Sequence, residues 1–352
     1  MFPEHNNFDC LRLVLALIVV LFHLAVLSGA HELGFLASYF SGNLAVDAFF
    51  VVSGFLVYMS FERSRSLGHY FEKRIRRILP AYVTVVVICS LAFFALSTLH
   101  ASEYFGLDWL RYLAANLSFL NFLHSTLPGV FEQNRLQAVN GALWTIKVEV
   151  MFYLVLPALA WASEKMPRWA CFTVVYVLSI IYSLVLTSLA KVHPQYLVFE
   201  RQLPGQLAFF VSGMLLYVYY ERFRSLAIYV IGPAFLLVVF GRHAHWLYPL
   251  YPLALGCVVV YVATVFPYLG NWGRFGDLSY GVYIWHFPLI QALVALGAFE
   301  ISPWGGFLLT LLGVLMFAWL SWHFVERPFL RRSSHYRQAE LAPKVQLHQY
   351  HR

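Results

Sequence analysis

Ten long apolar stretches constrain the fold of this chain more than any other feature of its sequence. A helix that crosses the hydrocarbon core of a bilayer needs about 20 mainly apolar residues. Stretches of about this length are expected to form spans at residues 9–29, 44–61, 80–100, 142–162, 169–189, 203–220, 226–241, 248–267, 277–298 and 304–325. None shows the alternating ten-residue pattern of a membrane β-barrel. The sequence therefore predicts an all-α polytopic membrane protein with about ten transmembrane helices.

The composition supports this class. Hydrophobic residues make up 61% of the 352 residues and charged residues only 12%, against about 25% charged residues in a typical soluble domain. Soluble globular, disordered and fibrous proteins are therefore excluded. The net charge of +7 does not indicate nucleic-acid binding, because the basic residues gather in the connections. The four cysteines lie in or beside apolar stretches without a CxxC pair, so free thiols are expected and no metal site is predicted.

The distribution of basic residues predicts the orientation in the membrane. The connections on one side and the C-terminal tail hold 17 of the 24 Lys and Arg residues, and the opposite side holds five. The positive-inside rule then places both termini in the cytoplasm. The first stretch is too long for a signal peptide and is interpreted as an uncleaved span. We expect one transmembrane domain over residues 1–332 and a short, flexible cytoplasmic tail over residues 333–352.

Two ionisable residues in the first stretch, Arg12 and His23, are eleven positions apart. In an α-helix this spacing gives an angular offset of about 20° and a rise of about 16 Å, so both side chains project from one face. The pair would join the cytoplasmic entrance to an imidazole deep in the bilayer. The alternative is that Arg12 anchors the helix at the surface and His23 makes a hydrogen-bonded helix contact.

Two acidic residues, Asp47 and Glu149, are predicted near the outer ends of their spans, at the depth of His23. A carboxylate there could orient the imidazole or pair with another cation. The alternatives are a favourable helix-dipole position for Asp47 and a structural ion pair for Glu149. In the second stretch, Ser53 and Gly54 predict close helix packing.

A second intramembrane histidine, His286, precedes Pro288 by two residues. Since a proline frees a helix carbonyl, His286 has either a site role or the structural role of satisfying that carbonyl. The aromatic side chains of Trp144 and Tyr153 are expected at the membrane interface or in a cavity.

Three closely spaced arginines, Arg74, Arg76 and Arg77, lie in the last part of the connection 62–79, just before the third span. Arg74 and Arg77 are three residues apart and can share a helical face. Guanidinium groups bind phosphate bidentately, which favours a site for a phosphate-bearing donor. Anionic lipid headgroups are the alternative ligand.

Taken in order, these motifs resemble the acyltransferase-3 family of integral membrane acyltransferases over residues 1–332. The resemblance rests on Arg12 and His23 with ten residues between them, on 46–56 (VDAFFVVSGFL), on Arg74 and Arg77 with Pro80, on 143–149 (LWTIKVE), on 280–288 (YGVYIWHFP) and on 325–328 (VERP). Many relatives carry Ser at the position of Lys147, so the partner of Glu149 is an open question.

The resemblance implies transfer of an acyl group, most often acetyl, from cytoplasmic acyl-CoA to a hydroxyl of an envelope glycan or glycolipid at a bacterial inner membrane. It implies that His23 is catalytic and that Arg74 and Arg77 handle the donor. Acetyl-CoA is then a co-substrate, and no permanently bound cofactor is expected. From the residues themselves we add predicted catalytic roles for Asp47 and Glu149, and donor-binding roles for Arg12 and Arg76. The predicted acceptor-binding residues are Trp144, Tyr153 and His286.

Other functions are open at this stage. A proton-coupled transporter or flippase of a polar lipid could use His23, Asp47 and Glu149, although the inverted repeats of that class are not visible. A glycosyltransferase with a lipid-phosphate sugar donor predicts acidic residues in the first outer loop, and residues 30–43 contain only Glu32. Within the acyltransferase hypothesis, His23 could act as a general base or as a nucleophile. The acceptor and the oligomeric state are not predicted.

Overall fold

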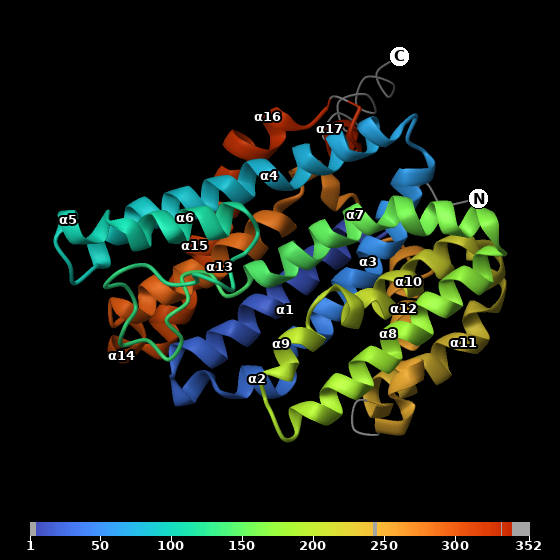
Figure 1. The fold of residues 1–352 in the computed structure, drawn as a ribbon, viewed down its shortest axis with the longest axis horizontal. Coiled ribbons are helices and arrows are strands. Elements are labelled where there is room, and N and C mark those ends of the chain that lie inside the picture. Colours follow the sequence, from blue (N-terminus) through green and yellow to red (C-terminus); the bar gives the residue numbers. More distant parts are fainter. Residues whose placement is uncertain (1–4, 242–244, 332, 340–352) are drawn as a thin grey trace, which may run out of the picture. The chain divides into compact units, whose positions relative to one another are not determined.

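The computed structural model describes residues 5–241, 245–331 and 333–339 (Figure 1). Within these ranges the secondary structure is helical and includes no strand, which confirms the predicted all-α class. Nine helical segments of the described chain are long and apolar enough to cross a membrane. They are Phe8–Ser28 (α1), Gly42–Glu62 (α3), Leu67–Leu96 (α4 and η2), Leu143–Lys165 (α7), Arg168–Ala190 (α8), Tyr220–Gly241 (α11), Trp246–Thr264 (most of η3, then α12), Leu278–Ala295 (α13) and Pro303–Phe329 (α15, η5 and α16).

The predicted sixth span is the one without a counterpart among these segments. It forms helix α10 (Leu203–Val218), which has only 16 residues and is therefore about 24 Å long. Most of its side chains are buried inside the protein, including Phe209, Phe210 and Met214. Its apolar composition therefore reflects packing on all sides. The predicted orientation of the termini stays a prediction.

The third span was predicted to begin at residue 80, after the basic connection 62–79, and this boundary is wrong. Helix α4 (Leu67–Ala92) begins well before Pro80 and includes all three arginines. An i,i+4 ion pair of 2.8 Å between Glu72 and Arg76 supports the first turns. The apolar pattern reveals only the apolar half of such a helix, because its first turns are polar and charged.

The chain forms two compact units. The first unit consists of Met1–Leu11, Val46–Phe71 and Val148–Gly270, and the second of Arg12–Ala45, Glu72–Lys147 and Asn271–Arg352. Helices α1, α3, α4 and α7 each contribute residues to both units. Each unit is described separately below.

In the first unit, helix α10 packs against α8 (Arg168–Ala190) and α12 (Tyr251–Thr264), and the short helix α9 (Tyr196–Glu200) packs against α8 (Figure 1). Helix α3 crosses α10 at close range. A Cβ atom at Gly54 would lie 1.9 Å from the carbonyl oxygen of Phe210, and one at Gly213 would lie 2.1 Å from that of Val51. The small-residue packing predicted for Ser53 and Gly54 is therefore confirmed.

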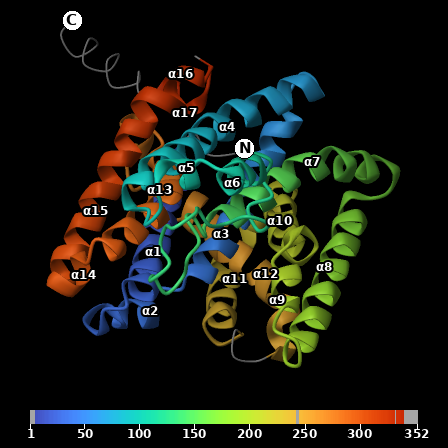
Figure 2. The ribbon, with the colours of Figure 1, turned by 60° about the vertical axis from the view of Figure 1, so that its left-hand side comes forward.

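In the second unit, helices α13 (Leu278–Ala295) and α15 (Pro303–Leu320) lie side by side (Figure 2). Their contact includes the rings of Trp285 and Phe317, whose centroids are 5.0 Å apart. The π-helical segment η5 (Ser321–Glu326) continues α15 and is followed by α16 (Arg327–Phe329). The remaining elements are η1 (His31–Leu33), α2 (Phe35–Tyr39), η2 (Phe93–Leu96), α5 (Ala101–Tyr104), α6 (Leu107–Leu117), η3 (His245–Leu250), η4 (Trp272–Phe275), α14 (Ala298–Ile301) and α17 (His335–Ala339).

Two smaller predictions can be compared with this architecture. The four cysteines are free thiols, as expected, and three of them, Cys89, Cys171 and Cys257, are buried. The tail was expected to be flexible, but its first residues form the short helix α17, which contacts the rest of the second unit. Residues 340–352 of the predicted tail lie outside the described residues.

Candidate functional site

The two intramembrane histidines of the second unit contact each other. Nδ1 of His23 in α1 lies 3.0 Å from Nε2 of His286 in α13, and the ring centroids are 5.0 Å apart. Each ring also contacts a backbone carbonyl of its own helix. Nδ1 of His23 is 3.0 Å from the oxygen of Val19, and Nδ1 of His286 is 2.6 Å from that of Tyr283. The sequence indicated both residues but not their contact.

The two imidazoles differ in accessibility. His286 has no exposed surface, whereas His23 keeps part of its surface exposed. The ring of Phe287 packs edge-on against His23 with a centroid distance of 5.3 Å. Among the described residues, Nε2 of His23 makes no hydrogen bond. Of the two histidines, His23 is therefore the one with exposed surface.

Pro288 shapes the helix that carries His286. Because proline has no N–H, the carbonyl of Ile284, four residues earlier, loses its helical partner. That carbonyl accepts a hydrogen bond of 2.9 Å from Nδ2 of Asn140. The sequence left open whether His286 would satisfy the freed carbonyl. Asn140 does so, and His286 bonds to Tyr283 instead.

A second cluster joins the same two helices nearer the N-terminal end of α1. Arg12 forms an ion pair of 2.6 Å with Asp277, the residue that caps the N-terminus of α13. Arg77 of α4 pairs with the same carboxylate oxygen and also with Glu326 at 2.9 Å. The Asp277 and Glu326 side chains are 4% and 1% exposed, and those of Arg12 and Arg77 are 18% and 12% exposed. These four residues are named the arginine–carboxylate cluster.

Neighbouring hydroxyl groups complete the cluster. Ser279 donates to Asp277 at 2.5 Å, and Ser321 donates to Glu326 at 2.9 Å. Tyr336 of α17 hydrogen-bonds to Arg12, and its ring lies 5.3 Å from the guanidinium carbon of Arg77. The tail therefore contributes a side chain to this region. Widened π-helical turns are frequent at functional sites, and η5 is the element that carries both Ser321 and Glu326.

The electrostatics of the cluster favour ionised Asp277. Burial on its own raises the pKa of this carboxyl group, but the charges of Arg12 and Arg77 outweigh burial. Hydrogen bonds with Ser279 and Tyr336 act in the same direction. Together they hold the pKa of Asp277 well below its usual range. The carboxylate is therefore charged at any physiological pH and can hold two guanidinium groups in place.

The two remaining predicted donor-binding residues lie on the same helix as Arg77. Arg76 is exposed and bonds to Glu72 and, at 3.1 Å, to the carbonyl of Phe329. Arg74 lies on α4 one turn before Arg77 and is partly buried. The structure therefore places Arg12, Arg74, Arg76 and Arg77 in the second unit, with Arg12 and Arg77 on one carboxylate.

The predicted site residues Asp47, Glu149 and Tyr153 belong to the first unit. Oε1 of Glu149 accepts hydrogen bonds from Ser53 at 3.0 Å and from Tyr153 at 2.5 Å. Asp47 lies partly buried near the start of α3. Their catalytic and acceptor-binding roles stay predictions. Trp144, the remaining predicted acceptor-binding residue, is half-buried at the start of α7 in the second unit.

Three residues were not named as site candidates from the sequence. They are Asp277 and Glu326 of the arginine–carboxylate cluster and Tyr336, which contacts it. Asp277 was only the first residue of the predicted span 277–298, and its cap hydrogen bond from the Ser279 N–H agrees with a helix that starts there. The charge of Asp277 was a usable signal. This acidic residue begins a predicted span, and Arg74 to Arg77 precede another predicted span on the same predicted side of the membrane. Tyr336 gave no signal, because the tail has no pattern that predicts a contact.

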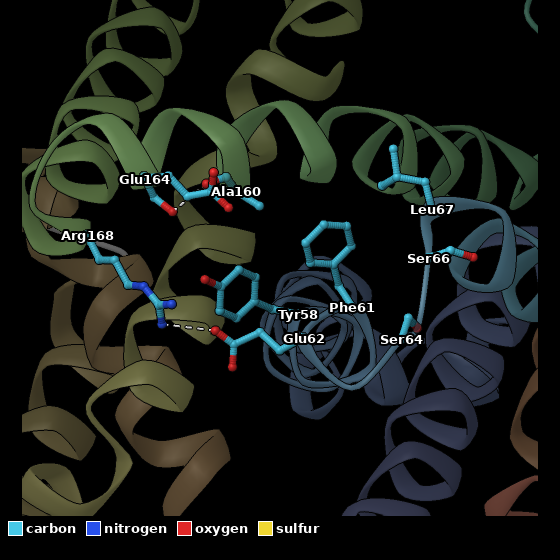
Figure 3. A pocket seen from close by; sticks show the side chains of 10 residues that line it. Tyr58, Phe61, Glu62, Ser64, Ser66, Leu67, Ala160, Glu164 and Arg168 are labelled. Atoms are coloured by element: carbon cyan, nitrogen blue, oxygen red, sulfur yellow. Dashed lines mark hydrogen bonds and ion pairs between the residues drawn. The ribbon is translucent and has the colours of Figure 1, made fainter.

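A separate pocket of about 560 Å³ lies in the first unit, where α3 ends and α7 turns into α8 (Figure 3). Glu62 and Arg168 point toward each other at its wall and form an ion pair of 2.9 Å. None of the predicted site residues lines this pocket. The described ranges also hold no group of three or more His, Cys, Asp or Glu side chains placed to bind a metal ion.

These contacts define a multi-pass helical membrane protein with a histidine pair and an arginine–carboxylate cluster on the same two helices. Residues 5–325 match the acyltransferase domain of the acyltransferase-3 family, and the chain belongs to that family. It is therefore a membrane-bound O-acyltransferase, as the sequence motifs indicated.

Curated relatives cover nearly the whole chain. An O-acetyl transferase of Shigella phage Sf6 is 28% identical over 94% of this chain and 98% of its own length. Nodulation protein 10 of Rhizobium leguminosarum bv. viciae is 28% identical over 93% of this chain and 94% of its own. The peptidoglycan O-acetyltransferase OatA of Listeria monocytogenes is 25% identical over 82% of this chain and 51% of its own. No solved structure matches the chain.

Proposed function

We propose that this protein transfers an acetyl group from cytoplasmic acetyl-CoA to a hydroxyl of a cell-surface glycan or glycolipid at a bacterial inner membrane. The names of the phage and Listeria relatives, an O-acetyl transferase and a peptidoglycan O-acetyltransferase, support acetyl as the transferred group. The observation that carries the proposal is the state of His23. Its Nδ1 has partners, its Nε2 has none among the described residues, and the residue as a whole is partly exposed.

In the proposed reaction, Nε2 of His23 takes the proton from the acceptor hydroxyl as that oxygen attacks the thioester carbonyl carbon. A C–O bond forms, and the C–S bond of the donor then breaks. The imidazolium returns its proton to the departing sulfur, which leaves as the CoA thiol. A nucleophilic route differs in that Nε2 itself carries the acetyl group between the two steps.

The basic side chains of the second unit are the proposed donor site. Arg12 and Arg77 pair with the carboxylates of the arginine–carboxylate cluster, and Arg74 and Arg76 lie on the same helix as Arg77. Guanidinium groups bind phosphates bidentately, which suits the phosphates of a CoA donor. Arg12 and His23 lie on one helix at a separation of about 16 Å along its axis. A donor held by its phosphates at Arg12 then extends its long thioester arm toward the imidazole.

The central test uses membrane vesicles from a deletion strain that expresses either the wild-type protein or His23→Ala, supplied with radiolabelled acetyl-CoA. We expect His23→Ala to lower label transfer to the glycan or lipid fraction by about 10²–10⁴-fold, the usual contribution of a general base. His323→Ala is the matched control, since it removes another imidazole bonded to its own helix, at Trp319. Near-normal transfer by His23→Ala would refute the proposal.

A second experiment tests the donor site. The double substitution Arg74→Gln and Arg76→Gln spares the arginine–carboxylate cluster, whereas any change at Arg77 would disturb it. We expect the apparent KM for acetyl-CoA to rise with little change in Vmax. Arg111→Gln, which removes an exposed guanidinium paired only to Asp108 among the described contacts, is the control. An unchanged KM in the double variant would contradict the assignment of donor phosphate to these arginines.

A further inference from the structure

The contact between the two histidines has a consequence for where their protons lie. A neutral imidazole carries a proton on one nitrogen and a lone pair on the other. Nδ1 of His286 lies 2.6 Å from the carbonyl of Tyr283. A carbonyl oxygen only accepts hydrogen bonds, so this nitrogen carries the proton of His286. Nε2 of His286 then presents a lone pair.

The same reasoning applies to His23. Its Nδ1 lies 3.0 Å from the carbonyl of Val19 and 3.0 Å from Nε2 of His286. Both neighbours are acceptors, so Nδ1 of His23 must carry its proton and share it between them. Every ring nitrogen in the pair is then accounted for except Nε2 of His23. That atom is left with a lone pair and no hydrogen bond from a described residue.

We propose that His286 is a positioning residue: its Nε2 accepts the Nδ1 proton of His23 and so fixes the ring and the tautomer that present Nε2 of His23 as the base. This inference rests on the proposed function of His23. It replaces the acceptor-binding role that the sequence indicated for His286. The complete burial of His286 supports a role through His23, since a residue with no exposed surface is shielded from a glycan.

The arrangement also serves the charged state of the reaction. When Nε2 of His23 takes the proton of the acceptor hydroxyl, the ring becomes an imidazolium that donates from both nitrogens. Its Nδ1–H then points at the lone pair of His286 and at the Val19 carbonyl. A hydrogen bond to a charged group is stronger than one to a neutral group. His286 therefore supports the ring most when the acyl group is being transferred.

Three substitutions at position 286 separate this role from simple packing. The side-chain oxygen of Gln can take the place of imidazole Nε2, whereas that of Asn matches Nδ1, and Phe keeps only the ring shape. We expect His286→Gln to retain most of the wild-type Vmax. His286→Asn and His286→Phe should lose about 10- to 100-fold, the range for one charge-assisted hydrogen bond. The apparent KM for acetyl-CoA should be unchanged in all three.

The assay is label transfer from radiolabelled acetyl-CoA in membrane vesicles, with Vmax normalised to the amount of protein that is extracted and monodisperse. A packing role predicts the opposite order, with Phe the best replacement and Gln and Asn equal, and that order would overturn the inference. If His286→Phe does not accumulate, the comparison of Gln with Asn decides, because both are polar amides. His323→Phe is the control for exchanging an imidazole for a phenyl ring.

The outcome for His23 is read separately. If His23→Ala transfers label normally, the proposed function itself fails, whatever the variants at position 286 do. If His23→Ala is inactive while His286→Phe and His286→Asn keep the wild-type Vmax, only the positioning role of His286 is refuted.

Discussion

Asp277→Asn is the substitution for which the structure gives the sharpest expectation of stability. The carboxylate is 4% exposed and accepts from both Arg12 and Arg77. Asparagine has almost the same shape but no charge, and its amide N–H groups cannot face a guanidinium. Glu326 would then be the one carboxylate left in the cluster for two partly buried cations. Breaking a buried ion pair by removing one partner costs about 3–5 kcal/mol.

That cost predicts a measurable change in thermal unfolding. For a cooperative unit of about 150–250 residues, 1 kcal/mol corresponds to about 2–4 °C. The expected decrease in the unfolding midpoint is thus about 6–20 °C. The assay is thermal unfolding of the full chain purified in detergent or nanodiscs, followed by fluorescence or by loss of the monodisperse peak.

Glu72→Gln is the matched control for this experiment. Glu72 also has two arginine partners, Arg76 and Arg331, but its side chain is 34% exposed and those of its partners 44% and 40%. Exposed ion pairs contribute little to stability, so its midpoint should stay close to that of the wild type. If the unfolding midpoint of Asp277→Asn is as high as that of Glu72→Gln, then the arginine–carboxylate cluster does not stabilise the fold and the reasoning is wrong.

Three further predictions concern folding. Gly54→Ala should prevent the close crossing of α3 and α10 and lower the yield of monodisperse protein, whereas Gly232→Ala, with no atom within 4 Å of the added Cβ, should be neutral or stabilising. Asn140→Ala should lower the free energy of unfolding by about 1–3 kcal/mol, because it leaves the carbonyl of Ile284 without its hydrogen bond. This loss should be smaller in a Pro288→Ala background, which restores a backbone N–H for that carbonyl. A double-mutant cycle of thermal unfolding measures both values. Acid should reduce the stabilisation by Asp277 only at low pH. The lowered pKa of Asp277 gives a stabilisation that is complete above its unfolded value of about 3.9 and is lost as the pH falls below it, so unfolding midpoints at pH 7 and pH 5 should show no loss from this group.

Most of the fold was predictable because the bilayer demands long apolar helices. The residues at which these helices begin and end were harder to predict. Helix α4 begins at Leu67, in a charged segment where hydropathy indicates a loop. Hydropathy does not mark the start of this helix, because its first turns are polar and charged. Helix α10 shows the converse ambiguity, and its prediction as a span is not confirmed. Its sequence is as apolar as a span, but burial among neighbouring helices explains that composition equally well.

The candidate site was predictable as a set of residues but not as a set of contacts. Helical spacing placed Arg12 and His23 on one face of α1, and both side chains do contact residues of the α13 region, Asp277 and His286. What no local pattern encodes is the pairing itself, since the histidines are 263 positions apart. A rare ionisable residue in a span indicates that a partner exists, and only the packing of α1 against α13 identifies it.

The two contacts between α1 and α13 also depend on each other. Arg12 meets Asp277 at the first turn of α13, and His23 meets His286 nine residues further along, a rise of about 14 Å. A single contact would let one helix pivot about the other, whereas two contacts at different depths restrain both sliding and rotation. The tautomer of His23 requires Nδ1 to stay within hydrogen-bond distance of His286, so it depends on that register. Asp277 is therefore expected to influence transfer at His23 without approaching the reacting atoms.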